Sequence, residues 1–321
     1  MLFSRFFVGV LLLAAAAAVA AQSYPSKALR LIVPFPPGGS ADILARTIGQ
    51  KMSEGLGQLV VIDNRPGAGT AIGAEATAKS APDGYTIMIG TVSSHAINPS
   101  LNAKLTYHPI RDFTPISPVA SIPFALLVHP SLSAKTVAEL IAAARAKPGV
   151  LNFSSAGNGT SNHLAGELFK SMARIDLVHI PYKGSAPALN DLLAGQVNMM
   201  FDLVLTAAPH VKAGSVRAIA VTSKERSSVL AGVPTVAESG LSGYDVSAWF
   251  GIFAPAGLPT TVTQRLNAEI VRIMRLADVR ERLAGQGAEP MASSAEAFAE
   301  YVRMELTKWS SVVQAAGMRS E

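Results

Sequence analysis

The amino-acid sequence predicts an α/β protein built as two lobes, and three observations lead to this fold class. Apolar runs of strand length alternate with stretches of helical periodicity, which favours parallel sheets with crossover helices. Hydrophobic residues make up 49% of the 321 residues and charged residues only 15%, which is typical of sheets covered on both faces. From about Leu258 the chain is nearly all helical, and such a tail usually packs back on the first set of strand and helix units.

The first 21 residues predict a secretory signal peptide. One positive charge, Arg5, precedes an apolar run that ends in small residues at 18–21. The run is just long enough to act instead as an uncleaved membrane anchor, but much of it is alanine, which is only weakly apolar. We therefore expect residues 1–21 to be removed and the protein to be exported.

The expected strands and helices follow in order. Apolar runs predict strands over residues 29–35, 59–65, 85–91, 124–130, 150–155, 177–182, 197–202 and 216–223. In the helix expected after Ser40, apolar residues recur at Leu44, Ile48 and Met52. The segment 183–195 reads as another helix, with a glycine where its C-terminal cap is expected.

Two strand-like runs are expected to connect the lobes, namely SIPFALLVHP (121–130), which extends the strand at 124–130, and GYDVSAWFGIFAP (243–255). With boundaries near residues 122 and 246, lobe 1 comprises residues 22–122 plus 246–321, and lobe 2 comprises 123–245. In the tail, Ser293 and Glu296 predict a capping box at the start of the last helix. The apolar face of that helix runs through Phe298, Val302, Leu306, Trp309 and Val313.

The turn in LRLIVPFPPGGSADILARTI (29–48) concentrates three prolines and two glycines between a strand and a helix. A rigid corner and an anion-binding helix N-terminus both explain it. Gly38 and Gly39 can adopt dihedrals closed to other residues, and Ser40 is a natural N-cap. Free N–H groups of the first turn and the helix dipole would attract an anion, whereas Asp42 complements the dipole.

Two other turns repeat this chemistry. Residues 150–169 again read as strand, Gly- and Ser/Thr-rich loop and helix, and TVSSHAINP (91–99) follows a third strand. Ligands of open parallel α/β sheets bind beyond the carboxyl ends of the strands, so these loops predict a shared cleft. The loops over 34–42 and 154–163 contain no Lys or Arg, so backbone N–H and hydroxyl groups would hold an anion.

PGAGTAIG (66–73) is a weaker motif. Its third glycine comes one residue too late for a dinucleotide fingerprint, and GNGTSN (157–162) lacks the third glycine. Neither has the Gly-Lys-Ser/Thr end of a Walker A loop. We interpret PGAG as a turn that leads into a helix of small residues.

No catalytic residue, metal site or cofactor is predicted. The sequence has no G-x-S-x-G, no cysteine, and no two histidines within five residues of each other. His95 and His163 fall in the cleft loops, where ligand contact and a structural role are both open. Asp202 ends a strand in the same region and would orient a loop, hold water or bind a ligand amine or hydroxyl.

The net charge of +5 does not indicate nucleic-acid binding, because Lys and Arg are scattered and aromatic residues make up only 6%. A mild positive field would help to collect anionic ligands.

Four segments in combination resemble the Bug/TctC family of periplasmic solute-binding proteins: residues 24–46, 60–90, 154–169 and 179–202. The resemblance covers essentially the whole mature chain. It implies a two-lobed periplasmic-binding-protein ("Venus flytrap") fold with two crossover strands, located in the periplasm. It also implies that a ligand carboxylate is gripped between the lobes, in part through ordered water. The implied contacts are Phe35, Gly39, Ser40, Ala41, Ser93, Ser94, Gly157, Thr160, Ser161 and Asp202.

The resemblance further implies a monomer whose ligand is a small carboxylate: a di- or tricarboxylate, an amino acid or an aromatic acid. The lobes would close on it, and the membrane subunits of a tripartite tricarboxylate carrier would recognise the closed form. An alternative is that closure signals to a partner such as a sensor kinase. A third hypothesis, an exported enzyme, lacks a catalytic constellation.

Overall fold

The computed structural model describes residues 24–102 and 104–315, so the predicted signal peptide lies outside the described residues. Within the described part, no helix combines the length and the apolar character needed to cross a membrane.

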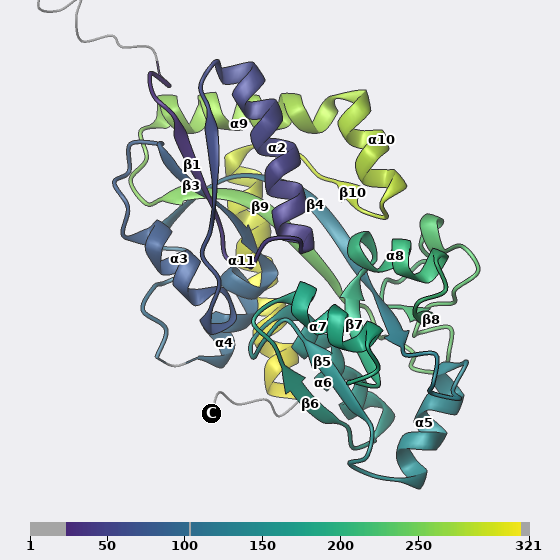
Figure 1. Cartoon of the computed structure of the whole chain (residues 1–321). Helices are drawn as coiled ribbons and strands as arrows, with labels where there is room; N and C mark the ends of the chain where they lie inside the picture. The colour runs from purple at the N-terminus through teal and green to yellow at the C-terminus, as the bar shows by residue number, and fades with distance from the viewer. Residues whose placement is uncertain (1–23, 103, 316–321) are drawn as a thin grey trace, which may run out of the picture.

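The described chain forms an α/β structure whose elements alternate as predicted (Figure 1). The strands are β1 (Leu29–Val33), β2 (Val60–Asn64), β3 (Thr86–Thr91), β4 (Phe113–Val128), β5 (Asn152–Ser155), β6 (Val178–Pro181), β7 (Met199–Leu203), β8 (Arg217–Val221), β9 (Ser247–Pro255) and β10 (Glu289–Pro290). The α-helices are α2 (Ser40–Leu56), α3 (Ala71–Ala78), α4 (Asn98–Leu101), α5 (Val137–Ala146), α6 (Ser161–Ala173), α7 (Ser185–Leu193), α8 (Val204–Lys212), α9 (Thr260–Arg275), α10 (Ala277–Gly285) and α11 (Ala295–Ala315). Short helical turns cover Ala68–Thr70, Ser93–Ile97 and Ser228–Leu230.

The strands form two sheet regions, one for each lobe. In lobe 1 the order is β2-β1-β3-β9-β4, and in lobe 2 it is β4-β7-β5-β6, with β8 also paired to β4. The pairs β1–β2, β1–β3, β5–β6 and β5–β7 are parallel, which confirms the crossover connections expected from the sequence. In Figure 1, lobe 1 lies above lobe 2, and β4 runs from one to the other.

Strand β4 changes partners as it leaves lobe 1. Its residues 113–123 pair with β9, and its residues 124–128 pair with β7. At this change, Thr222 joins the two connecting segments: its Oγ1 accepts from the Phe124 N–H at 2.8 Å and donates to the Val246 carbonyl at 2.6 Å. This arrangement supports boundaries near residues 122 and 246, which we keep as a proposal.

The first half of β4 was not predicted as a strand. Pro115 and Pro118 interrupt its pattern, and proline lacks the N–H that a sheet ladder needs. The structure accommodates both of them where the register with β9 shifts, between Pro115 and Ser117 and between Pro118 and Ala120. Pairing with a long neighbour strand overrides the local signal.

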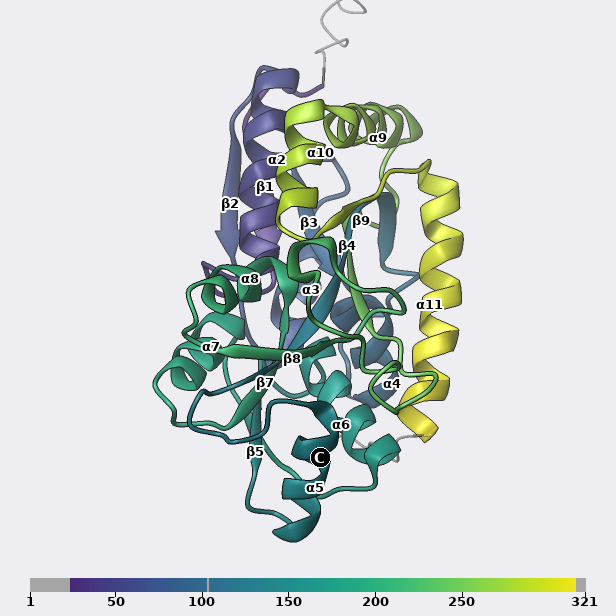
Figure 2. The ribbon, with the colours of Figure 1, turned by 90° about the vertical axis from the view of Figure 1, so that its right-hand side faces the viewer.

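Helix α11 covers lobe 1 as a long outer helix, as Figure 2 shows. Most of the predicted apolar face is fully buried: Phe298, Val302, Trp309 and Val313 are at most 2% exposed. The predicted cap, however, is wrong by one residue, because the Ser294 hydroxyl accepts from the Ala297 N–H at 3.2 Å. The carbonyl of Ser293 is instead held by the Asn267 side chain of α9 at 2.8 Å.

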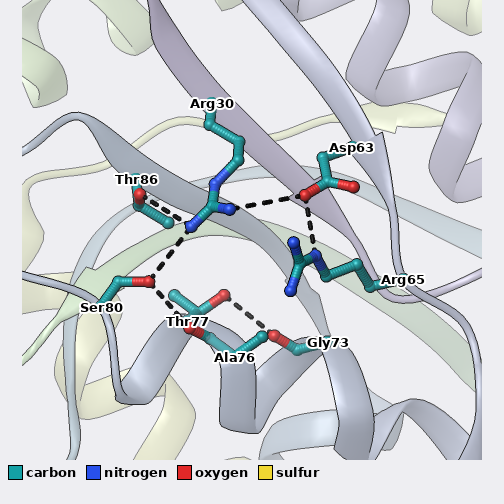
Figure 3. Close-up of polar contacts among 8 residues, drawn as sticks. All are labelled: Arg30, Asp63, Arg65, Gly73, Ala76, Thr77, Ser80 and Thr86. Carbon is teal, nitrogen blue, oxygen red and sulfur yellow. Dashed lines mark hydrogen bonds and ion pairs between the residues drawn. The ribbon is translucent and has the colours of Figure 1, made fainter.

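A polar network fastens α3 to the sheet of lobe 1 (Figure 3). The Arg30 guanidinium of β1 donates to Thr86 of β3 at 3.2 Å and to Ser80, just after α3, at 3.4 Å. It also lies 3.7 Å from the Asp63 carboxylate of β2, which accepts from Arg65 at 2.8 Å. Because Arg65 precedes the PGAGT turn and Ser80 follows α3, this network fixes both ends of the segment that contains the turn and the helix.

Candidate binding site

Two cavities lie between the lobes, where the loops that follow β1 and β3 meet those that follow β5, β6 and β7. The smaller cavity measures about 20 Å³ and the larger about 790 Å³, and Phe35 and Pro36 line both. A volume of roughly 10–15 Å³ on this measure holds one water molecule. The smaller cavity therefore admits little more than one water, whereas the larger falls in the usual range of small-molecule sites.

Most of the predicted contacts meet at the smaller cavity. Phe35, Gly39, Ser40, Ala41, Ser93 and Ser161 line it, together with Pro36, Thr91, Asn162, Ser185, Leu203, Ala248 and Phe250. Gly157 lines the larger cavity, and Ser94, Thr160 and Asp202 line neither. No Lys or Arg is among the residues around the smaller cavity, so hydroxyl and backbone groups are its polar donors.

Helix α2 supplies the lobe 1 side of this cavity. The helix begins at Ser40 and its N-cap is Gly39, so the prediction that Ser40 is the N-cap is wrong. Gly39 has an ordinary φ of −83°, whereas Gly38, with φ of 88°, is the residue that needs glycine. The N–H groups of Ser40 and Ala41 have no hydrogen-bond partner in the described chain, as expected for a first helical turn.

Asp42 stabilises the turn before α2 and does not line either cavity. Its carboxylate accepts from the Gly38 N–H at 3.0 Å, from Arg46 at 2.9 Å and from Asn64 at 3.0 Å. Burial raises the pKa of Asp42, but these hydrogen bonds outweigh it and the net pKa is lowered. The charged carboxylate thus fixes the loop that presents the free amides.

The Ser40 side chain faces the other lobe. Its Oγ lies 3.4 Å from Thr206 Oγ1 of α8, and Thr206 in turn donates to Asp202 Oδ2 at 2.7 Å. Asp202 is fully buried, its Oδ1 has no partner in the described chain, and burial raises its pKa to about 7. A chain of hydroxyl and carboxyl groups therefore crosses between the lobes behind the smaller cavity.

Helix α6 supplies the lobe 2 side. It begins at Ser161, and its N-cap Thr160 donates its hydroxyl to the Gly157 carbonyl at 2.7 Å, inside the turn. The Ser161 N–H donates across the cleft to Ser93 Oγ at 3.0 Å, and the two serine hydroxyls lie 3.4 Å apart. The loops after β3 and β5 are thus in direct contact.

Ser94 and His95 belong to the interior of lobe 1. Ser94 Oγ accepts from the Thr91 N–H at 2.9 Å and lies 2.8 Å from His95 Nδ1. The His95 ring stacks on Phe253 with centroids 3.8 Å apart, and complete burial lowers the pKa of this histidine to about 3. Of the two roles left open for His95, the packing favours the structural one.

His163 lines the larger cavity and stacks on His179, with ring centroids 4.0 Å apart. Burial lowers the pKa of His163 to about 4 and that of His179 to about 3, so both rings are neutral near pH 7. His163 Nδ1 accepts from the Gly159 N–H at 3.3 Å, which leaves its ring proton on Nε2.

The PGAGT turn, residues 66–70, lines the larger cavity, a contribution that was not predicted from the sequence. A Cβ on Gly69 would collide with the Asn158 carbonyl of lobe 2, and a Cβ on Gly159 would collide with the Asn98 side chain. Asn98 also donates to the Gly69 carbonyl. The turn follows β2, so its place at the carboxyl edge of the sheet was the available signal, and we interpreted it as a connection only.

Within the described residues, no group of three or more His, Cys, Asp and Glu side chains is arranged to hold a metal ion. The polar groups gathered at the two cavities suit the binding of a small anionic molecule with hydrogen-bonding groups.

Known proteins that are similar to this chain support the same interpretation of the site. Residues 44–318 match the model of the TctC family, described as the tripartite tricarboxylate transporter family receptor. Three solved structures are similar over their full length. The protein Rpa4515 of R. palustris with adipate is 38% identical, with a TM-score of 0.91 over 93% of this chain and 100% of its own.

The periplasmic binding protein BugD is 32% identical, with a TM-score of 0.90 over 93% of this chain and 100% of its own. MatC from Rhodopseudomonas palustris with bound malate is 34% identical, with a TM-score of 0.87 over 90% of this chain and 100% of its own.

Proposed function

This chain belongs to the TctC family of tripartite tricarboxylate transporter receptors, and we propose that it captures a small carboxylate between its lobes for delivery to a membrane transporter. The family consists of substrate-binding receptors of the periplasmic binding type, not of enzymes. Adipate and malate in two similar proteins support a carboxylate as the ligand class.

One observation carries the proposal: the free amides of Ser40 and Ala41, at the start of α2, border the same small cavity as Ser93 and Ser161. A helix N-terminus attracts an anion through its unpaired N–H groups and its dipole. Hydrogen bonds to a charged carboxylate are stronger than neutral ones, and exclusion of water strengthens them further. We propose Phe35, Gly39, Ser40, Ala41, Ser93 and Ser161 as the residues that surround the carboxylate group. Because the cavity of about 20 Å³ holds little more than one water, the lobes would have to part slightly to accommodate it.

We propose that the remaining predicted residues do not touch the carboxylate but position the residues that do. Gly157 and Thr160 shape the turn before α6, and Ser94 fixes the turn before Ser93. Asp202 holds Thr206, which reaches the Ser40 side chain. These residues position the donors.

Opening of the lobes would separate Ser93 from Ser161 and Ser40 from Thr206, which admits the ligand. Closure around the carboxylate would then create the form that the membrane subunits recognise. We propose that the protein acts in this way in the periplasm as a monomer, after removal of residues 1–21.

Isothermal titration calorimetry on the chain from residue 22 onward tests the proposal. The panel contains adipate, malate, citrate, an amino acid and benzoate, with glucosamine as a cationic sugar control. We expect saturable binding of at least one carboxylate and none of the sugar. Absence of binding by every carboxylate, with the protein folded, would refute the function.

A further inference from the structure

The larger cavity is lined by one cationic residue, Lys183. Apart from the two neutral histidines, only Glu167 and Lys183 among the residues around the two cavities can carry a charge near pH 7. The Glu167 carboxylate is already paired with Lys170 Nζ at 3.0 Å. Lys183 is not one of the lysines that form ion pairs in the described chain, which are Lys27, Lys51, Lys79, Lys170 and Lys308. The charge that lacks a partner at this cavity is therefore positive.

Lys183 also lies close to the smaller cavity. Ser185, two residues further along the chain, lines the smaller cavity, whereas Lys183 lines the larger one. Because two residues span at most about 7 Å of extended chain, the backbone of Lys183 stands near the place proposed for the first carboxylate. Its ammonium is carried on a flexible four-carbon stem. It can thus meet the far end of a small ligand whose first carboxylate is in the smaller cavity.

The backbone on both sides of Lys183 is held in place. The Tyr182 N–H donates to the Ser155 carbonyl of lobe 2 at 3.1 Å. Gly184, with φ of 129°, approaches lobe 1 so closely that a Cβ there would lie 2.5 Å from Pro36 Cδ. Pro36 lines both cavities. The loop is therefore fixed where the two cavities adjoin, whereas the Lys183 side chain is exposed.

We propose that Lys183 binds a second anionic group of the ligand, at the end remote from the smaller cavity, and so favours dianionic over monoanionic ligands. The inference rests on the proposed function, since it assumes that a first carboxylate occupies the smaller cavity. The neutral donors of that cavity act on the first carboxylate of either kind of ligand. The Lys183 charge acts on the remote end alone, so it sets the preference between the two kinds.

Matched acids test the ligand class by calorimetry at pH 7 and low salt. Succinate is compared with monomethyl succinate, and adipate with monomethyl adipate, so that each pair shares a carbon chain and differs by one charge. We expect the diacid of at least one pair to bind roughly 1.5- to 5-fold more tightly than its ester, the range of an exposed ion pair. Equal affinity, or preference for the ester, in both pairs would overturn the inference.

The same experiment separates this inference from the proposed function. If none of these four compounds binds but another acid of the wider panel does, the inference fails and the proposed function stands. Failure of every carboxylate to bind overturns both.

The salt dependence shows whether charge causes the preference. Salt screens exposed charges, with a Debye length of about 30 Å at 0.01 M and about 3 Å at 1 M. The ratio of ester to diacid dissociation constants should therefore fall toward one as NaCl rises from about 0.01 M to about 1 M. A ratio that does not change would contradict an ion pair with Lys183.

Variants of Lys183 test the residue. Lys183→Met keeps an apolar stem and removes the charge, so it should cancel the preference for the diacid and leave ester affinity unchanged. Lys183→Arg should retain the preference, and Lys183→Glu should reverse it.

Lys147→Met is the matched control. Lys147 is also an exposed lysine of lobe 2 outside the ion pairs of the described chain, but it lines neither cavity. This variant should keep the wild-type preference, because it changes the net charge equally without altering the site. A preference that survives in Lys183→Met, or that is lost equally in Lys147→Met, would show that Lys183 does not bind the remote group.

Discussion

The helix starts of α2 in lobe 1 and α6 in lobe 2 have nearly the same backbone geometry and different partners. The N-cap residues Gly39 and Thr160 are both extended, with φ and ψ of −83° and 169° against −84° and 160°. The N–H of Ser161 donates to Ser93 of the opposite lobe, whereas the N–H of Ser40 has no partner in the described chain. The first amide of α6 is thus already bound to the other lobe, whereas the first amide of α2 remains available for a ligand.

A local motif thus supplies the donors, and the packing between the lobes decides which of them are available. On that basis, α2 is the main anion site and α6 contributes mostly to closure.

The largest effect is expected for Gly39→Val, on the lobe 1 side of the smaller cavity. This change should abolish detectable carboxylate binding. A Cβ at Gly39 meets no atom within 4 Å, and its φ of −83° suits valine, so the protein should fold. The added methyl groups would stand at a cavity of about 20 Å³ and exclude the carboxylate. Calorimetry measures the loss, and circular dichroism and the Tm serve as folding controls. Wild-type affinity would show that the anion binds elsewhere.

A second test concerns Asp202, which supports the contact between Ser40 and lobe 2. Burial raises the pKa of Asp202 to about 7 from the ordinary 3.8, so the folded state holds this proton at pH values where the unfolded chain has lost it. The wild type should therefore lose stability as pH rises from about 4 to 7, by on the order of 1.4 kcal/mol per unit from this group.

Asp202→Asn lacks this titration. Urea unfolding from pH 4 to 8 should show the free energy of unfolding of the variant gaining on that of the wild type up to about pH 7 and then running parallel to it. Groups common to both proteins cancel in the difference. A difference that stays constant from pH 4 to 8 would contradict the raised pKa.

The direct comparison of the two helix starts uses Ser40→Pro and Ser161→Pro. Each change removes one N–H at the first helical position, where proline is tolerated, after a residue already extended. We expect Ser40→Pro to weaken carboxylate binding roughly 10- to 150-fold, the range of one hydrogen bond to a charged group.

Ser161→Pro should weaken binding by only about 2- to 10-fold, because its N–H already has a neutral partner in Ser93. Ser40→Ala, which keeps the amide, is the control for the lost hydroxyl. Equal losses in the two proline variants would remove the distinction between the two helix starts.

Much of the fold was predictable because its signals are local. The apolar repeat at Leu44, Ile48 and Met52 is fully buried, and α2 ends at Gly57 with φ of 68°. The errors arose where distant contacts override local ones. Two prolines of β4 are absorbed by register shifts with β9, and the helix that Ser293 was expected to cap begins at Ala295 with Ser294 as its cap.

The candidate site likewise contains residues that the sequence identified and residues that it did not. Phe35, Gly39, Ser40 and Ala41 were identifiable because strand, turn and helix start are contiguous in the chain. Gly69 was not, since its close approach to the Asn158 carbonyl of lobe 2 joins residues far apart in the chain.

The sequence by itself determined the alternation of strands and helices, the turns that begin α2 and α6 and the absence of cationic side chains from them, because each depends on neighbours a few residues apart. Tertiary structure alone decided which donors are free, through contacts such as Ser93 with Ser161 and Ser40 with Thr206. Those pairs lie 68 and 166 residues apart in the chain, and only the packing of one lobe against the other fixes their distances.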